Sequence, residues 1–259
     1  MPFFEHNDLR THYEFTQNPG RPVLVFSNSL GATLTMWDAQ VAELAAHYSI
    51  LRYDARGHGA SSVPEGPYNV EQLSQDLLAL LDHLGLERVH LCGLSMGGAV
   101  AQWIGANAGD RLAKLVLAST AAKFGTAAGW NERIATVLED GMVSIAGATM
   151  ERWFTEGFRW RERELVAKVR QEFESCDPLG YTAACAVVRD ADSRGSLERI
   201  TAPTLIIFGP QDSTTTGIDA GFLAEHIADS KVTEVDGAHL LNIEHPEAFN
   251  RALREFLGG

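Results

Sequence analysis

The feature that most constrains the fold is a regular alternation of short apolar runs with segments of helical periodicity. Residues 22–27 (PVLVFS) and 49–53 (SILRY) are almost continuously apolar, as strands buried on both faces of a parallel sheet are. Residues 11–15 (THYEF) alternate polar and apolar side chains and are predicted to form an edge strand. Further predicted strands are residues 89–92, 112–117, 204–208 and 231–235.

Helical patterns separate these runs. Asn69 and Gln72 have the spacing of a capping box, and the leucines that follow at positions 73, 77, 80, 81 and 84 form the apolar stripe of an amphipathic helix. Further predicted helices are residues 37–46, 96–106, 222–227 and 246–256. The alternation predicts an α/β fold with a mostly parallel central sheet and helices on both faces.

One segment, residues 121–194, breaks the alternation. It contains helical patterns and no convincing strand, and three of the five tryptophans lie in it. The predicted helices are residues 131–140, 143–154, 162–174 and 181–189. We therefore predict a core made of residues 1–120 and 195–259, with residues 121–194 inserted as a helical cap.

A serine stands between glycines where a predicted strand becomes a predicted helix. The stretch Gly93-Leu94-Ser95-Met96-Gly97 is the pattern G-x-S-x-G, which in this context is typical of a nucleophile elbow. The turn is so tight that the positions two residues to either side of the serine must be small. A small-residue turn that only packs a helix on a sheet is the alternative, whereas the G-x-G-x-x-G of a dinucleotide-binding loop is absent.

A serine hydroxyl needs a base, and the base needs a group that orients it. Asp212 follows the predicted strand at 204–208, and His239 follows the one at 231–235. This is the order Ser, Asp, His found with such elbows, and all three residues fall at the carboxyl ends of strands, where open α/β sheets build sites. We predict that Ser95 is the nucleophile, His239 the base and Asp212 the orienting acid. The other candidates, which are less well placed, are His58, His245, Asp190, Asp192 and Asp236.

Acyl-transfer chemistry also needs donors for the oxyanion. The backbone N–H that follows the nucleophile belongs to Met96, and the second donor comes from the loop after the first long central strand, where Leu30 is the best candidate. No metal-ligand spacing is present, and we expect neither a metal nor an organic cofactor.

The net charge of −13 argues against a nucleic acid or an anionic membrane as partner. It also means that an anionic substrate requires a local cation. The three cysteines lack CxxC spacing and are expected to be reduced thiols. The start of the chain has no signal-peptide pattern, and no apolar run approaches the ~18 residues of a membrane span, so a cytoplasmic location is expected. The oligomeric state stays open.

Several segments resemble those of the α/β-hydrolase superfamily and, within it, the 3-oxoadipate enol-lactonases. They are SNSLGATLTMWD, RYDARGHGASSVPEGPYNVEQL, CGLSMGG, GWNERIATV, ERWF and GAHLLNIEHPEAF. Many relatives have His-Gly where this chain has Asn28-Ser29, and the Asn-Ser form is similar to the lactonases. The resemblance implies hydrolysis of a five-membered enol-lactone bearing an acetate arm, in the breakdown of aromatic compounds, and Ser95, Asp212 and His239 match the triad positions. No extra decarboxylase domain is expected.

A carboxylate arm entering an acidic protein suggests an arginine clamp. Arg133 is our first choice, with Trp130 and Trp153 as walls of the pocket, although cap arginines are often solvated and cap tryptophans are often core. Alternative activities are those of a general carboxylesterase, a cofactor-free haloperoxidase-like perhydrolase or a C–C bond hydrolase. Dehalogenase and epoxide hydrolase activities are disfavoured because their nucleophile is an aspartate. A binding module that keeps the fold without turnover is a further alternative.

Overall fold

The computed structural model describes residues 2–258 and is built around an eight-stranded sheet. Its strands are β1 (Phe3–His6), β2 (Leu9–Thr16), β3 (Val23–Ser27), β4 (Ser49–Tyr53), β5 (Val89–Leu94), β6 (Leu112–Ala118), β7 (Thr204–Phe208) and β8 (Ser230–Glu234). All six residues of β5 are buried, because helices cover both faces of the sheet at its centre. The predicted α/β class is confirmed.

The strands follow the order β1-β2-β4-β3-β5-β6-β7-β8. β1 and β2 pair in antiparallel fashion, as do β2 and β4, and every other neighbouring pair is parallel. The prediction that residues 11–15 form an edge strand is therefore wrong. β1, which was not predicted, pairs with β2 from Phe3 opposite His12 to His6 opposite Leu9 and takes the edge position.

Eleven α-helices and three 3₁₀ helices lie within residues 2–258. Those outside residues 121–194 are η1 (Leu34–Trp37), α1 (Asp38–Leu44), α2 (Val70–His83), α3 (Met96–Asn107), η2 (Gly109–Arg111), η3 (Leu197–Arg199), α9 (Gly217–His226), α10 (Leu241–Glu244) and α11 (Pro246–Leu257). α3 packs on β3, β5 and β6 and against α2, while α1 packs against α11. The predicted capping box at the start of α2 is present, with Asn69 and Gln72 each accepting from the other's backbone N–H.

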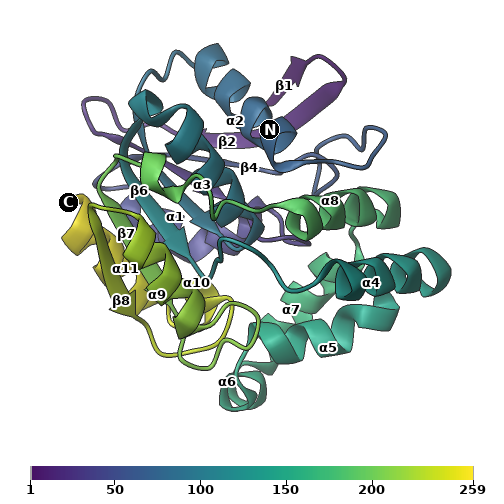
Figure 1. Cartoon of the computed structure of the whole chain (residues 1–259). Helices are drawn as coiled ribbons and strands as arrows, with labels where there is room; N and C mark the ends of the chain where they lie inside the picture. The colour runs from purple at the N-terminus through teal and green to yellow at the C-terminus, as the bar shows by residue number, and fades with distance from the viewer. Residues whose placement is uncertain (1, 259) are drawn as a thin grey trace.

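Five α-helices lie in the chain between β6 and η3. They are α4 (Ala127–Asp140), α5 (Val143–Trp153), α6 (Glu156–Arg161), α7 (Arg163–Glu174) and α8 (Pro178–Asp190). Figure 1 shows them gathered to one side of the sheet, in teal and green at the right. α6 was not predicted; Thr155 caps it by accepting from the Phe158 N–H. The division of the chain into a core and a cap unit stays a prediction.

The site is positioned by the parallel part of the sheet. The carboxyl ends of β3, β5, β6, β7 and β8 meet at one edge because these strands run in the same direction. Loops from that edge and side chains from α4, α5 and α8 line a common cavity. Within residues 2–258, no helix has the length and apolar character needed to cross a membrane.

Candidate active site

Ser95 lies on a strained turn between β5 and α3. Its φ is 58° and its ψ is −115°, a left-handed conformation that a serine rarely adopts. A Cβ on Gly93 would lie 2.1 Å from the carbonyl oxygen of Gly97, and a Cβ on Gly97 would lie 2.1 Å from that of Ser27. The turn predicted from the spacing G-x-S-x-G is therefore present, and both flanking glycines are sterically required.

Asp212 and His239 lie together beyond the ends of β7 and β8. His239 Nδ1 is 2.8 Å from Asp212 Oδ2, and both side chains are almost fully buried. The carboxylate also accepts from the Thr214 N–H at 2.7 Å, the Thr215 N–H at 3.1 Å and the Thr215 hydroxyl at 2.7 Å. Burial opposes ionisation, but His239 and these donors outweigh it, so the pKa of Asp212 lies below its usual range. A carboxylate accepts from Nδ1–H, which leaves Nε2 of a neutral imidazole free to take a proton.

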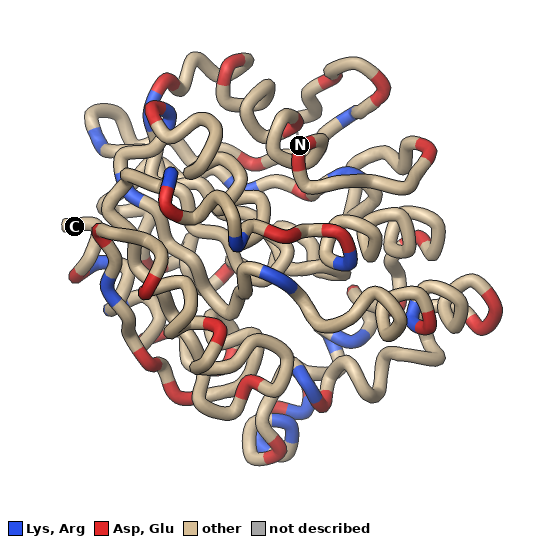
Figure 2. Tube along the Cα trace, viewed as in Figure 1, with Lys and Arg blue, Asp and Glu red and all other residues tan. Residues whose placement is uncertain are grey.

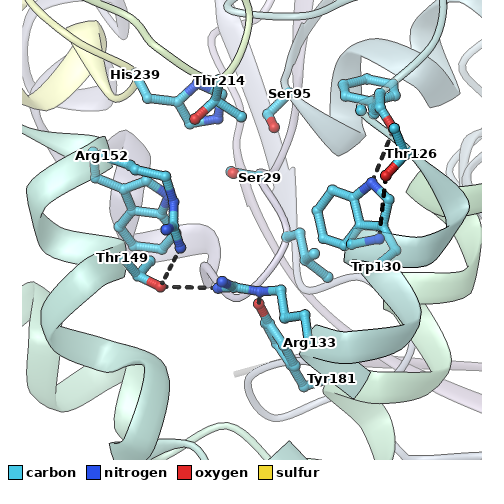
Figure 3. Close-up of a pocket in the computed structure, with 15 residues that line it drawn as sticks. Ser29, Ser95, Thr126, Trp130, Arg133, Thr149, Arg152, Tyr181, Thr214 and His239 are labelled. Carbon is cyan, nitrogen blue, oxygen red and sulfur yellow. Dashed lines mark hydrogen bonds between the residues drawn. The ribbon is translucent and has the colours of Figure 1, made fainter. Parts of the chain in front are cut away.

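Ser95 and His239 open into the same cavity (Figure 3). No hydrogen bond joins the Ser95 hydroxyl to the imidazole among the described residues, although both residues line the cavity. Catalytic hydrogen bonds are often long before substrate binds. Ser95 and His239 thus lie at the same edge of the sheet, where a proton could pass between them once substrate is bound.

Two backbone N–H groups beside Ser95 are uncommitted. The Gly97 N–H donates to Asn28 O, the Gly31 N–H to His58 Nε2 and the Ala32 N–H to Ser29 O. In contrast, the N–H groups of Leu30 and Met96 donate to no acceptor within residues 2–258. An anion at this point would find these two donors and the N-terminal end of α3.

Two hydrogen bonds of the Asn28 side chain fix the loop that carries Leu30. Asn28 Nδ2 donates to Tyr53 O at 2.8 Å, and Asn28 Oδ1 accepts from Trp37 Nε1 at 2.8 Å. These bonds use both the NH₂ group and the oxygen of the Asn28 amide, so they fix the position of the loop that follows β3.

The far side of the cavity carries two arginines. The cavity measures about 270 Å³, and Arg133 of α4 and Arg152 of α5 lie across it from Ser95 (Figure 3). Arg133 donates from Nε to Tyr181 Oη at 2.7 Å and from Nη2 to Thr149 Oγ1 at 2.8 Å, and Arg152 Nη2 lies 3.3 Å from the same Thr149 oxygen. Arg133 is thus in the cavity as predicted.

Neither arginine forms an ion pair within the described part of the chain. Burial and the neighbouring charge of Arg133 lower the pKa of Arg152. Figure 2 shows acidic residues spread over most of the trace, and the net charge of the chain is −13. The cavity is positively charged by contrast, because two guanidinium groups without an ion-pair partner line it. They are suited to bind a small anion that enters from solvent.

Sequence reasoning found part of this lining and missed part. Trp130 and Trp153 both line the cavity, and Trp130 Nε1 donates to Phe124 O at 2.9 Å. Arg152 was missed although it lies in the segment ERWF beside Trp153. Thr149 and Tyr181 carried no signal, because their place follows from how α5 and α8 pack.

The competing candidates lie elsewhere. His58 is buried and accepts from the Gly31 N–H at 2.9 Å, and burial lowers the pKa of its imidazole. His245 is the residue before α11. The three aspartates contact other surface residues: Asp190 pairs with Arg189, Asp192 with Arg194, and Asp236 accepts from Gln211. None of these five residues lines the cavity.

No group of three or more His, Cys, Asp or Glu side chains is arranged to hold a metal ion within residues 2–258. The cysteines Cys92, Cys176 and Cys185 are unpaired and buried. Burial raises the pKa of each thiol, to about 12 for Cys176 and Cys185.

Comparison with known proteins gives independent evidence of the family and the fold. Residues 24–252 match the Alpha/beta hydrolase family. The chain is 41% identical to 3-oxoadipate enol-lactonase 2 of Acinetobacter baylyi, over 98% of this chain and 97% of that protein. The crystal structure of the enol-lactonase from Burkholderia xenovorans LB400 superposes with a TM-score of 0.98 at 38% identity, covering 100% of both chains. A malate-bound thermophilic esterase from Thermogutta terrifontis has a TM-score of 0.90 at 32% identity, covering 96% of this chain and 93% of the esterase.

Proposed function

The chain belongs to the α/β-hydrolase family, and from this membership we propose that it hydrolyses 3-oxoadipate enol-lactone to 3-oxoadipate. The observation that carries the proposal is one cavity that holds Ser95 and His239 on one side and two unpaired arginines on the other. The first pair suits acyl transfer, and the second suits the carboxylate arm of this lactone.

In the first step, Ser95 Oγ attacks the lactone carbonyl while His239 Nε2 takes the hydroxyl proton. Asp212 holds the imidazole through Nδ1 and stabilises its charged form. The carbonyl oxygen becomes an oxyanion that accepts from the Leu30 and Met96 N–H groups, whose lack of other acceptors supports this role. Removing one such donor typically costs about 2.7–4 kcal/mol of transition-state stabilisation.

Collapse of the tetrahedral intermediate breaks the ring C–O bond. The leaving oxygen is an enol, a far better leaving group than an alkoxide, and it receives the proton held by His239. The enol stays tethered to the acyl group and tautomerises to a ketone, which removes the nucleophile that would close the ring again. Water, deprotonated by His239, then attacks the Ser95 ester, and the second collapse returns the proton to Ser95 Oγ and releases 3-oxoadipate.

The acetate arm pairs with the guanidinium groups on the far side of the cavity. Arg133 uses two N–H groups for Tyr181 and Thr149, which fixes its plane while other donors stay available. Arg152 adds a second charge beside it, and Trp130 and Trp153 line the same cavity.

A direct assay tests the proposal. Purified enzyme should remove the ultraviolet absorbance of the enol-lactone rapidly and should turn over p-nitrophenyl acetate much more slowly. Rapid turnover of the neutral ester without turnover of the lactone would instead favour a general carboxylesterase. The similarity to the Thermogutta terrifontis esterase makes that activity the second candidate.

A further inference from the structure

A buried carboxylate that the proposed mechanism does not use lies beside the histidine loop. Glu244 of α10 is 4% exposed, and it forms no ion pair within residues 2–258. A buried charge without a counter-ion is costly unless several hydrogen-bond donors satisfy it. The donors to Glu244 therefore indicate which segments of the chain this carboxylate holds together.

The donors come from two segments that are far apart in the chain. Glu244 Oε2 accepts from the Ala238 N–H at 3.1 Å, one residue before His239. The Thr155 N–H lies 3.3 Å from both carboxylate oxygens, and the Thr155 hydroxyl donates to Oε1. Thr155 is the N-cap residue of α6, so one carboxylate connects the start of this helix to the loop of the catalytic histidine.

Two backbone bonds run in parallel with this connection. The carbonyl of Trp153 accepts from the N–H of His239 at 3.2 Å and from the N–H of Leu240 at 3.0 Å. The side chain of the same Trp153 forms part of the cavity wall. Residues 153–155 and 238–240 are thus connected both directly, through the backbone, and through the side chain of Glu244.

Only a carboxylate fits this position. The three groups that face Glu244 are two backbone N–H groups, which can only donate, and the Thr155 hydroxyl. That hydroxyl accepts from the Phe158 N–H at 3.3 Å, which leaves its proton for Glu244. A glutamine of the same shape would point an NH₂ group at one of these donors.

We infer that Glu244 is a positioning residue, which keeps the His239 imidazole aligned with Ser95 by locking residues 238–240 to residues 153–155. This inference rests on the proposed function, since it assumes the Ser95–His239 pair. Loss of the lock lets the imidazole drift relative to Ser95, and a misplacement of about 1 Å costs on the order of 100-fold in rate.

The test is the rate at which a serine-reactive phosphonate labels Ser95, measured by intact mass below the unfolding temperature of each variant. We expect Glu244→Gln to label at least about 10-fold more slowly than wild type and to lose kcat by a similar factor, with a smaller change in KM. Thr155→Val removes the hydroxyl contact to Glu244 and leaves the backbone N–H contact of residue 155 in place, so it should show a smaller loss of the same kind. Glu247→Gln makes the same chemical change at an exposed position of α11 and should label at the wild-type rate.

The outcomes separate the two proposals. Equal labelling of wild type and Glu244→Gln, with only a lower Tm, means that the carboxylate serves folding alone and overturns the inference while leaving the proposed function intact. If Glu244→Gln does not fold, unchanged labelling and kcat in Thr155→Val overturn it in the same way. Wild-type protein that is not labelled at all overturns the catalytic serine and the positioning role together.

Discussion

Replacing Arg133 by Met tests whether the cation across the cavity recognises the substrate's carboxylate. The guanidinium gives Nε–H to Tyr181 and one Nη2–H to Thr149, which leaves three of its five N–H groups free. A hydrogen bond to a charged group contributes about 1.5–3 kcal/mol. Because Arg152 remains beside the site, we expect the loss of one such contact, or a fall of about 10- to 150-fold in kcat/KM on the enol-lactone.

The assay compares two substrates, because the substitution also removes the Arg133 contact from the Tyr181 and Thr149 hydroxyls, of which Thr149 Oγ1 keeps its contact with Arg152 Nη2. Any resulting disorder slows both substrates, whereas the charge contact affects only the anionic one. The ratio of kcat/KM on the enol-lactone to that on p-nitrophenyl acetate should therefore fall by the stated factor. Arg161→Met, at a side chain that is 61% exposed in the same helical segment, should leave the ratio unchanged. An equal loss on both substrates, or none, would refute the clamp.

Four further expectations follow from the geometry and from the shifted pKa values. Asp212→Asn should lower kcat by about 10⁴-fold, since the wrong imidazole tautomer is then favoured; a normal rate would move the acid role to another carboxylate. The pKa of Asp212 is lower in the folded state than in the unfolded chain. The ionised carboxylate therefore stabilises the fold above the unfolded pKa of about 3.9, and this stabilisation is lost as the pH falls below that value. On acidification from about pH 4, the Tm of wild type should drop more than that of Asp212→Asn. Gly97→Ala places a methyl group against the Ser27 carbonyl and should destabilise the fold by about 1–3 kcal/mol in urea titration, and an unchanged midpoint would mean that the turn relaxes. The thiols of Cys176 and Cys185, with pKa values raised to about 12, should resist a thiol reagent at pH 8 until denaturant is added, so rapid labelling of native protein would show that these sites open.

The sequence predicted the fold where local pattern and buried environment agree. The strand at 49–53 and the strand at 204–208 match β4 and β7 residue for residue, because continuous apolar runs suit strands buried on both faces. β1 was missed because Phe3–His6 is largely exposed and has no alternation. Its strand conformation depends on pairing with β2, which is a tertiary contact.

The site divides in the same way. The strained turn at Ser95 was predictable because its glycines are a local steric requirement. The convergence of Arg133 and Arg152 on Thr149 was not, since it depends on the packing of α4 against α5. Glu244 lies in a segment that the sequence singled out, but its partners at 155 and 238 are visible only in the folded chain.

Turnover by Ser95→Ala tests the central claim most directly, because that claim gives the Ser95 hydroxyl proton to His239. The substitution removes one oxygen from a side chain that makes no capping hydrogen bond to α3, so the Tm should stay close to that of wild type. We predict that kcat on the enol-lactone falls by at least about 10⁴-fold. A folded Ser95→Ala protein that still hydrolyses the lactone at a rate near that of wild type would contradict the account.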